Sequence, residues 1–254
     1  MGNEFIPVGA LGDGFAPGAD LLEPTDELSG ASFELDLDGP DQLRLGDGVA
    51  SWGAHADVPV RVTSIRPGTY LVDGLAGETS TTFALDTEAG LVTMIEGRLP
   101  SEQVRAESAH TRVRRGDEPT GVTARIVHGA LDGSTATVHA PTDELVGLRN
   151  RYTYSPNESY EHIYLTPELF TWHCLEGVER GLADTDRCHH IAIRDGLVLF
   201  AWREKIVPTL GVLLIDLHGM RTDGKIFGNN GFDTSSVVNF PVGARAEVLG
   251  RTTS

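Results

Sequence analysis

Pro24-Thr25-Asp26-Glu27-Leu28-Ser29-Gly30 and Pro141-Thr142-Asp143-Glu144-Leu145-Val146-Gly147 are two copies of one heptapeptide. They are identical at six of seven positions and lie 117 residues apart, a match that chance rarely produces. Self-similarity at a fixed spacing predicts homologous modules. We therefore expect two domains, 1–140 with an N-terminal arm and 141–254 with a C-terminal arm. Weaker echoes follow both copies in the same order: Trp52 with Trp172, Phe83–Asp86 with Leu213–Asp216, and Ile95–Gly97 with Ile226–Gly228.

Apolar and polar residues alternate within both modules with a period of two, which is typical of half-buried β-strands. Asp-Gly pairs at 73–74, 195–196 and 223–224 and the run 155–157 indicate turns between strands. Short strands at this spacing, in modules of roughly 100 residues, predict an all-β fold of antiparallel barrels or sandwiches. The expected strands are 32–37, 58–65, 70–72, 79–85 and 91–96 in the first module and 160–165, 170–175, 189–194, 197–204 and 210–217 in the second.

The chain has 254 residues and a formal net charge of −17, from 37 acidic and 20 basic residues. This charge argues against a nucleic-acid partner, because binding to phosphate backbones depends on clustered Lys and Arg. No apolar run is long enough to span a bilayer, and the first residues lack the pattern of a signal peptide. The two cysteines, Cys174 and Cys188, are too few for a disulfide framework. We therefore expect a cytoplasmic protein that binds neither nucleic acid nor membrane.

The charge and the chemically useful side chains are divided unequally between the modules. Up to Gly147 there are 24 acidic and nine basic residues, a net of −15, whereas from Leu148 onward there are 13 and 11, a net of −2. The second module instead holds four of the five tyrosines, two of the three tryptophans and five of the nine histidines. We expect the site there, and we interpret the first module as a degenerate partner barrel.

Strand alternation indicates which of these side chains meet. Tyr152 and Tyr154 share one strand face and present two phenol donors. Glu204 ends a strand whose same face carries only apolar side chains, so burial is expected to raise its pKa as a general acid requires. The alternative is a Glu204 carboxylate in solvent, paired with Arg203 or Lys205. The residues that share the Glu204 face are Val198, Phe200 and Trp202.

A metal site is the competing interpretation of the histidines and cysteines. Neighbours on a strand point to opposite faces, so at most Cys174, Cys188 and His190, or His173 and His189, can converge. No CxxC or HxxxH spacing accompanies them. We therefore expect no metal ligand, and histidines that line a cavity or hydrogen-bond the backbone.

Several long motifs resemble the MoaF family, which is named for molybdenum cofactor biosynthesis. The resemblance covers nearly the whole chain and implies two tandem lipocalin-like antiparallel β-barrels, in agreement with the repeat. The motifs are Phe5–Phe15, Ile95–Pro100, Tyr160–Leu165, Arg187–His190, Trp202–Asp216 and Gly224–Gly228.

The stretch 151–165 is also similar to the opening strands of bacterial phenolic acid decarboxylases, single lipocalin-like barrels that work without a cofactor. This second resemblance implies that Tyr152 and Tyr154 hold a substrate carboxylate and that Glu204 is the acid. The active-site arginine of that family aligns near Gly181 and Leu182, so Arg180 or Arg187 would have to replace it.

Two functions follow from these patterns. The first is a cofactor-independent lyase or isomerase that acts on an aromatic or unsaturated small molecule, with Glu204, Tyr152, Tyr154 and His162 as catalytic residues. The second is a lipocalin-like protein that binds a small molecule, such as a pterin, without chemistry. A homodimer is one of the oligomeric states left open. The residues expected to bind the small molecule are Tyr164, Trp172, His173, Arg180, Arg187, His190 and Trp202.

Overall fold

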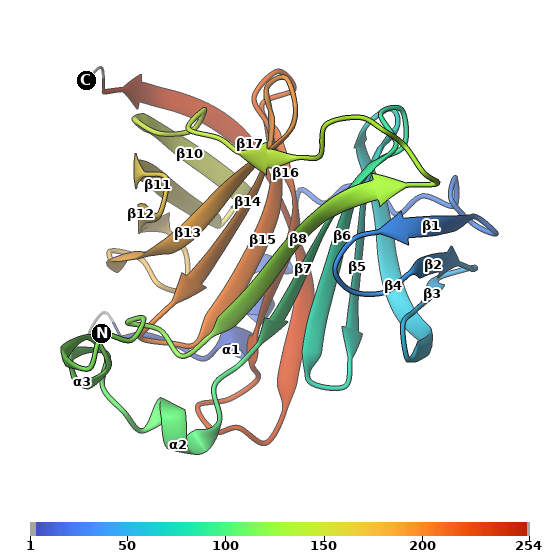
Figure 1. Cartoon of the computed structure of the whole chain (residues 1–254). Helices are drawn as coiled ribbons and strands as arrows, with labels where there is room; N and C mark the ends of the chain where they lie inside the picture. Colours follow the sequence, from blue (N-terminus) through green and yellow to red (C-terminus); the bar gives the residue numbers. More distant parts are fainter. Residues whose placement is uncertain (1–3, 253–254) are drawn as a thin grey trace.

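The molecule, seen in a computed structural model that describes residues 4–252, consists of two closed antiparallel β-barrels in tandem (Figure 1). In the first barrel each strand pairs with the next, and β1 closes the barrel on β8 where Leu35 faces Leu131. Its strands are β1 (Ser32–Asp36), β2 (Gln42–Leu45), β3 (Val49–Trp52), β4 (His55–Arg66), β5 (Thr69–Ala76), β6 (Thr79–Asp86), β7 (Leu91–Arg98) and β8 (Thr123–Leu131).

The second barrel repeats this arrangement with eight strands of its own, closed where Tyr152 on β10 pairs with Ala246 on β17. The short β9 (Ala140–Pro141) adds to the edge of β13 at Ile191. The barrel strands are β10 (Leu148–Ser155), β11 (Glu158–Thr166), β12 (Leu169–Glu176), β13 (Ala183–Arg194), β14 (Leu197–Glu204), β15 (Thr209–Asp216), β16 (Arg221–Asn229) and β17 (Val237–Arg251).

The two barrels correspond strand by strand, as the repeat predicts. Strands β4 and β13 each have 12 residues, and β5, β6, β14 and β15 each have eight. The predicted all-β fold of two tandem barrels is thus confirmed. The barrel strands lie on either side of the expected boundary, since β8 ends at Leu131 and β10 begins at Leu148.

Two of the expected turns are instead the middles of strands. Asp73-Gly74 lies within β5 and Asp223-Gly224 within β16, whereas 195–196 and 156–157 are turns. Asp223 is buried and Asp73 is half-buried, and both accept hydrogen bonds from other strands, Asp73 from Thr82 and Asn239, and Asp223 from Arg61 and Thr63. A local turn signal is overridden here because each Asp accepts hydrogen bonds within or between the barrels.

The barrels contact each other through strands that are buried on both faces. Every residue of β15 is buried, although only alternate residues point into its own barrel. The other set, which includes Leu210, forms a third apolar cluster with Leu199 and Phe227 of the same barrel and with Leu71 and Ile95 of the first barrel. The closely packed strands β6 to β8 and β13 to β15 in Figure 1 flank this interface.

Two Arg–Asp ion pairs, which we call the clamps, join the barrels at the ends of this interface. Arg66 at the end of β4 binds Asp216 at 2.5 Å and donates to the carbonyls of Asp195 and Gly196. Arg194 at the end of β13 binds Asp86 at 2.5 Å and donates to the carbonyls of the turn at 67–68. The barrels therefore meet with approximate two-fold symmetry, like the subunits of an isologous dimer.

The short helices occur in the arm and in one connection. Helix α1 (Val8–Phe15) precedes the first barrel in sequence but packs into the second, where Val8 and Phe15 are buried in its core cluster. The N-terminal arm, which we expected to belong with the first barrel, is therefore part of the second. Helices α2 (Glu102–Arg105) and α3 (Ala109–Arg114) lie between β7 and β8. None of the helices in residues 4–252 has the length and apolar character needed to cross a bilayer.

Candidate functional site

One mouth of the second barrel holds a small cavity that α1 lines with Leu11 and Phe15. Its volume is about 30 Å³, so a ligand of more than a few atoms can enter only if side chains of the lining move. Its walls are mainly aromatic, and the ring centroids of Phe15 on α1 and Tyr154 are 4.8 Å apart. The lining residues are Leu11, Phe15, Tyr154, Tyr160, His162, Trp172, Glu179, Trp202, Glu204 and Ile226.

Glu204 turns its carboxyl into this cavity, as the strand alternation predicts. Val198, Phe200 and Trp202 belong to the core of the second barrel, and the indole Nε1 of Trp202 donates to Glu204 Oε1 at 2.8 Å. The alternative pairing is wrong, because Lys205 binds Asp184 and Asp186 instead. Burial, followed by the nearby charge of Asp186, raises the pKa of Glu204 well above its usual value.

Two further acids lie close to Glu204. Glu179, in the turn between β12 and β13, also lines the cavity and accepts a hydrogen bond from the Tyr160 hydroxyl at 3.2 Å. Asp186 on β13 accepts a hydrogen bond from Trp172 Nε1 at 3.1 Å. Burial raises the pKa of Glu179, and burial together with Asp184 raises the pKa of Asp186. The cavity is thus an apolar site with an unusual concentration of carboxyls that favour the protonated form.

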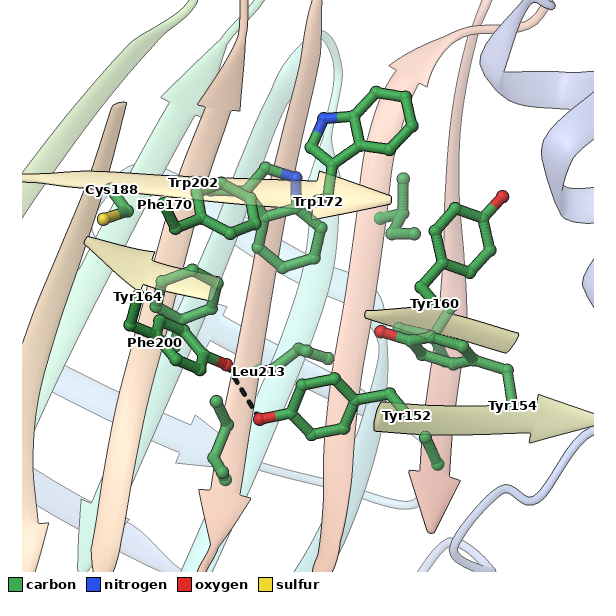
Figure 2. Packing of buried hydrophobic residues seen from close by; sticks show 14 of the residues in the cluster. Tyr152, Tyr154, Tyr160, Tyr164, Phe170, Trp172, Cys188, Phe200, Trp202 and Leu213 are labelled. Atoms are coloured by element: carbon green, nitrogen blue, oxygen red, sulfur yellow. Dashed lines mark hydrogen bonds between the residues drawn. The ribbon is translucent and has the colours of Figure 1, made fainter. Parts of the chain in front are cut away.

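The two tyrosines of the first strand have different environments. Tyr152 is fully buried, and its hydroxyl contacts the Tyr164 hydroxyl at 2.7 Å and accepts a bond from Asn150 (Figure 2). Tyr154 lines the cavity, and its hydroxyl makes no hydrogen bond to another described residue. The expected pair of substrate-facing phenols therefore reduces to Tyr154, while Tyr152 and Tyr164 pair with each other in the core.

Two of the candidate histidines, His162 and His190, lie inside the barrel, and the third, His173, lies outside it. His162 lines the cavity, and burial lowers its pKa to about 3, so the ring is neutral at physiological pH. His190 lies in the barrel interior against Cys188, with 3.3 Å between His190 Nε2 and the Cys188 Sγ. His173 is on the outer face, 3.5 Å from Glu161, because residues 172 and 173 of one strand point to opposite sides. Only His162 can meet a ligand of this cavity without rearrangement.

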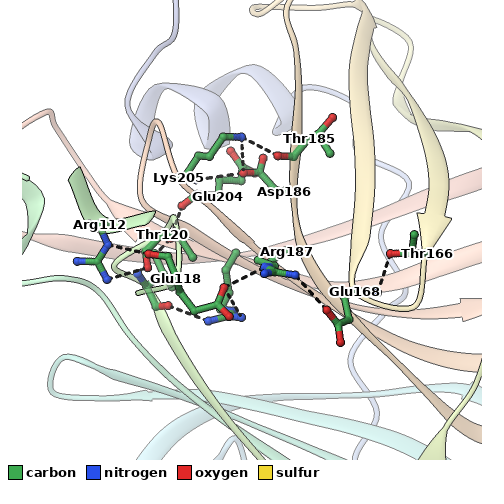
Figure 3. Close-up of polar contacts among 12 residues, drawn as sticks. Arg112, Glu118, Thr120, Thr166, Glu168, Thr185, Asp186, Arg187, Glu204 and Lys205 are labelled. Carbon is green, nitrogen blue, oxygen red and sulfur yellow. Dashed lines mark hydrogen bonds and ion pairs between the residues drawn. The ribbon is translucent and has the colours of Figure 1, made fainter. Parts of the chain in front are cut away.

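The two candidate arginines lie outside the cavity. Arg180 is exposed in the turn at 177–181, and Arg187 binds Glu118 and Glu168 on the outer surface (Figure 3). The expectation that one of them replaces a carboxylate-binding arginine is therefore not met by this geometry. Arg187 points outward because Asp186 and Cys188, its neighbours on β13, are buried.

The segment that precedes β8 in the first module hydrogen-bonds the end of β14, the strand that carries Glu204. The hydroxyl of Thr120, just before β8, donates to the backbone carbonyl of Glu204 at 2.7 Å (Figure 3). Arg112 of α3 in turn donates to the carbonyls of Glu118 and Thr120. The connection that carries α2 and α3 thereby holds β14 where it leaves the barrel.

Within residues 4–252, no group of three or more His, Cys, Asp or Glu side chains has the arrangement of a metal site. Larger hollows lie between the barrels, beside Arg61 and Asp73, and at the mouth of the first barrel, beside Leu28 and Val62. The lining of neither combines aromatic walls with carboxyls, as the second barrel does.

Five lining residues were not predicted from the sequence, namely Leu11, Phe15, Tyr160, Glu179 and Ile226. Tyr160 was detectable, because it shares a strand face with His162. Glu179 lies in a turn, where alternation gives no orientation. Phe15 belongs to an arm whose barrel could not be assigned from local pattern, since only the tertiary structure brings it to Tyr154.

Comparisons with known proteins agree with this two-barrel organisation. Residues 3–101 match the model of the MoaF N-terminal domain, and residues 139–252 match the model of the MoaF C-terminal domain. Protein MoaF of Klebsiella aerogenes is 45% identical over 257 aligned residues, which cover 98% of this chain and 96% of that protein. A solved structure named "putative beta-lactamase" from Burkholderia vietnamiensis overlaps 41% of this chain and 95% of its own, at 11% identity and a TM-score of 0.35. This chain belongs to the MoaF family.

Proposed function

We propose that the second barrel is a cofactor-independent lyase or isomerase site, in which Glu204 transfers a proton to or from a small organic molecule. The carboxyl of Glu204 is the observation that carries this proposal. It faces an aromatic cavity, receives a hydrogen bond from Trp202, and has no cation beside it among the cavity-lining residues. A carboxyl whose pKa is raised toward neutrality is suited to act as a general acid and then as a base.

The surrounding side chains supply the remaining parts of such a reaction. The Tyr154 hydroxyl can donate to an oxygen on which negative charge develops. In an isomerisation, protonated Glu204 gives its proton to one carbon of a conjugated substrate, and the resulting carboxylate removes a proton from another carbon. The neutral ring of His162 can hydrogen-bond the substrate beside Glu204, but its lowered pKa leaves the proton transfers to Glu204.

The charge of the cavity limits the substrate. Decarboxylation of an aromatic acid needs a group that binds the substrate carboxylate, and Arg180 and Arg187 point elsewhere. The proposal therefore takes the acid and the tyrosine from the resemblance to phenolic acid decarboxylases, without the carboxylate-binding arginine. Neutral or cationic substrates fit the lining better.

The test is turnover of a polar metabolite extract in D2O, followed by mass spectrometry. We expect the wild type to change the mass or the deuterium content of at least one metabolite. Glu204→Gln should reduce that rate about 100-fold or more, the usual contribution of a general acid. Glu247→Gln, on the outer face of β17, is the matched control and should leave it unchanged. Full turnover by both Glu204→Gln and Tyr154→Phe would contradict the proposal.

A binding protein without chemistry, for a pterin or another small molecule, is the second candidate. The packing of α1 along the cavity favours it, because a carrier must retain its ligand. This candidate predicts that a ligand binds to the wild type while no metabolite changes and no deuterium is incorporated.

A further inference from the structure

We infer that the second barrel recognises a small organic ammonium ion, held between the aromatic walls of its mouth cavity and the carboxyls of Glu204 and Glu179. This inference rests on the proposed function, because it names the class of ligand for the same cavity. It is carried by three features of the lining: the rings, the balance of charge and the unpartnered polar atoms.

The rings form a box of the kind that binds cations. Tyr154 and Tyr160 have ring centroids 6.0 Å apart and planes at 83°, and Tyr160 and Trp172 have centroids 6.3 Å apart and planes at 54°. Trp202 completes the wall beside Glu204. A desolvated cation over the face of any of these rings is stabilised by cation–π attraction.

The carboxyls around this space have no cation of the described chain beside them to balance their charge when they ionise. Glu204 and Glu179 are the two charged residues of the lining. The nearest lysine, Lys205, binds Asp184 at 2.5 Å, the carbonyl of Thr185 at 2.6 Å and Asp186 at 3.2 Å. Since Lys205 is fully engaged at the rim, an ammonium ion would be the counter-charge that the two glutamates lack.

Two nearly buried polar side chains of the lining also await a partner. Tyr154 is 4% exposed and His162 is 3% exposed. The Tyr154 hydroxyl and the Nε2 atom of His162 make no hydrogen bond to any residue in 4–252, since the one bond of His162 is made by Nδ1. Neither atom is among the fully buried unsatisfied polar atoms of the described chain, so both are accessible from the cavity and free to hydrogen-bond a ligand there.

Proton release follows from the same arrangement. Burial raises the pKa of Glu204 and of Glu179 in the empty cavity, with Asp184 and Asp186 adding to the effect at Glu204. A bound cation favours the ionised carboxylate, so an ammonium ion should expel a proton that an uncharged ligand would leave in place.

The experiment is titration calorimetry of the full chain with matched probes at pH 7. The probes are benzylammonium, benzyl alcohol and benzoate, which share one ring, and choline with its neutral analogue in which carbon replaces the ammonium nitrogen. We expect at least one ammonium probe to bind about tenfold or more tightly than its neutral analogue, since cation–π attraction contributes ~2 kcal/mol at desolvated sites. Buffers of different ionisation enthalpy should reveal proton release on binding.

Variants separate the site from general electrostatics. Glu204→Gln should weaken the ammonium probe about tenfold or more and abolish most of the proton release, whereas Glu247→Gln should do neither. Proton release by the wild type remains a test if Glu204→Gln folds poorly. The inference is overturned if neither ammonium probe binds better than its neutral analogue, or if benzoate binds best. Benzyl alcohol or benzoate binding that Glu204→Gln abolishes would overturn the ammonium ligand alone and leave the proposed function standing.

Discussion

Removal of one charge from an inter-barrel clamp gives a quantitative test of the two-fold arrangement. Asp216 is 5% exposed, binds Arg66 at 2.5 Å, and accepts backbone N–H bonds from His218 and Gly219. Asp216→Asn keeps an oxygen for these N–H groups but removes the charge opposite Arg66. A hydrogen bond to a charged group contributes about 1.5–3 kcal/mol, so the free energy of unfolding should fall by about 2–3 kcal/mol. Asp86→Asn should have at least as large an effect, because Arg194 bonds both carboxylate oxygens of Asp86.

The clamp prediction also has a pH dependence with a defined sign. Burial would raise the pKa of both aspartates, but hydrogen bonds from the clamp arginines and from the backbone outweigh it and hold the pKa below the usual value. A carboxyl with a depressed folded-state pKa stabilises the protein above its unfolded pKa of about 3.9, and this contribution is lost as the pH falls through the folded-state pKa. The difference between wild type and Asp216→Asn should therefore be full near neutrality and vanish in acid.

Urea unfolding followed by tryptophan fluorescence is the assay, since Trp52 reports the first barrel and Trp172 and Trp202 the second. Asp38→Asn is the control, because Asp38 pairs with Arg125 on the surface with its own side chain 93% exposed, and it should change the free energy by less than about 1 kcal/mol. The reasoning is refuted if Asp216→Asn matches wild type, or if only one of the two clamp variants is destabilised.

Three further changes test the site. Tyr152→Phe should cost about 1 kcal/mol in urea unfolding and leave ligand affinity unchanged, because its hydroxyl bonds only within the core; reduced affinity would contradict this. Phe15→Ala should speed ligand association in stopped-flow fluorescence, since Phe15 lines the cavity and packs on Tyr154; an unchanged rate would count against α1 as a barrier to entry. Gly211→Ala should lower the melting temperature and abolish binding, because its Cβ would lie 2.1 Å from the Trp202 ring; retained affinity would show that Trp202 is not a wall.

Much of the fold could be predicted because its determinants are local and periodic. The heptapeptide repeat gave two modules, and alternation gave β14 with its inward face, including Glu204, at its observed bounds of Leu197–Glu204. The interface could not be predicted, since strands such as β15 are apolar on both faces and alternation then carries no orientation. The Asp-Gly pairs at 73–74 and 223–224 misled for a related reason: their partners are distant in sequence.

The candidate site was predictable only where one strand carried the information. Glu204, Trp202 and Tyr154 lie on inward strand faces and line the cavity together. Alternation also places Tyr152 inside the barrel. It does not show that the Tyr152 hydroxyl is already hydrogen-bonded to Tyr164, because that contact joins side chains of different strands. Arg187 was assigned by alignment to another family, and the outward face of β13 overrules that assignment.

The state of the Glu204 carboxyl tests the central claim most directly, and the indole resonances can report it. The Trp202 indole N–H donates to Glu204, whereas the Trp52 indole N–H is buried without a partner in the described chain. In a pH titration of the ¹H–¹⁵N spectrum, the Trp202 indole signal should titrate with a midpoint well above the ordinary glutamate value of about 4.3, while the Trp52 signal stays constant. Glu204→Gln should remove the Trp202 transition. A Trp202 signal that shows no transition above about pH 4.3 would mean an ordinary, ionised glutamate and would contradict the account.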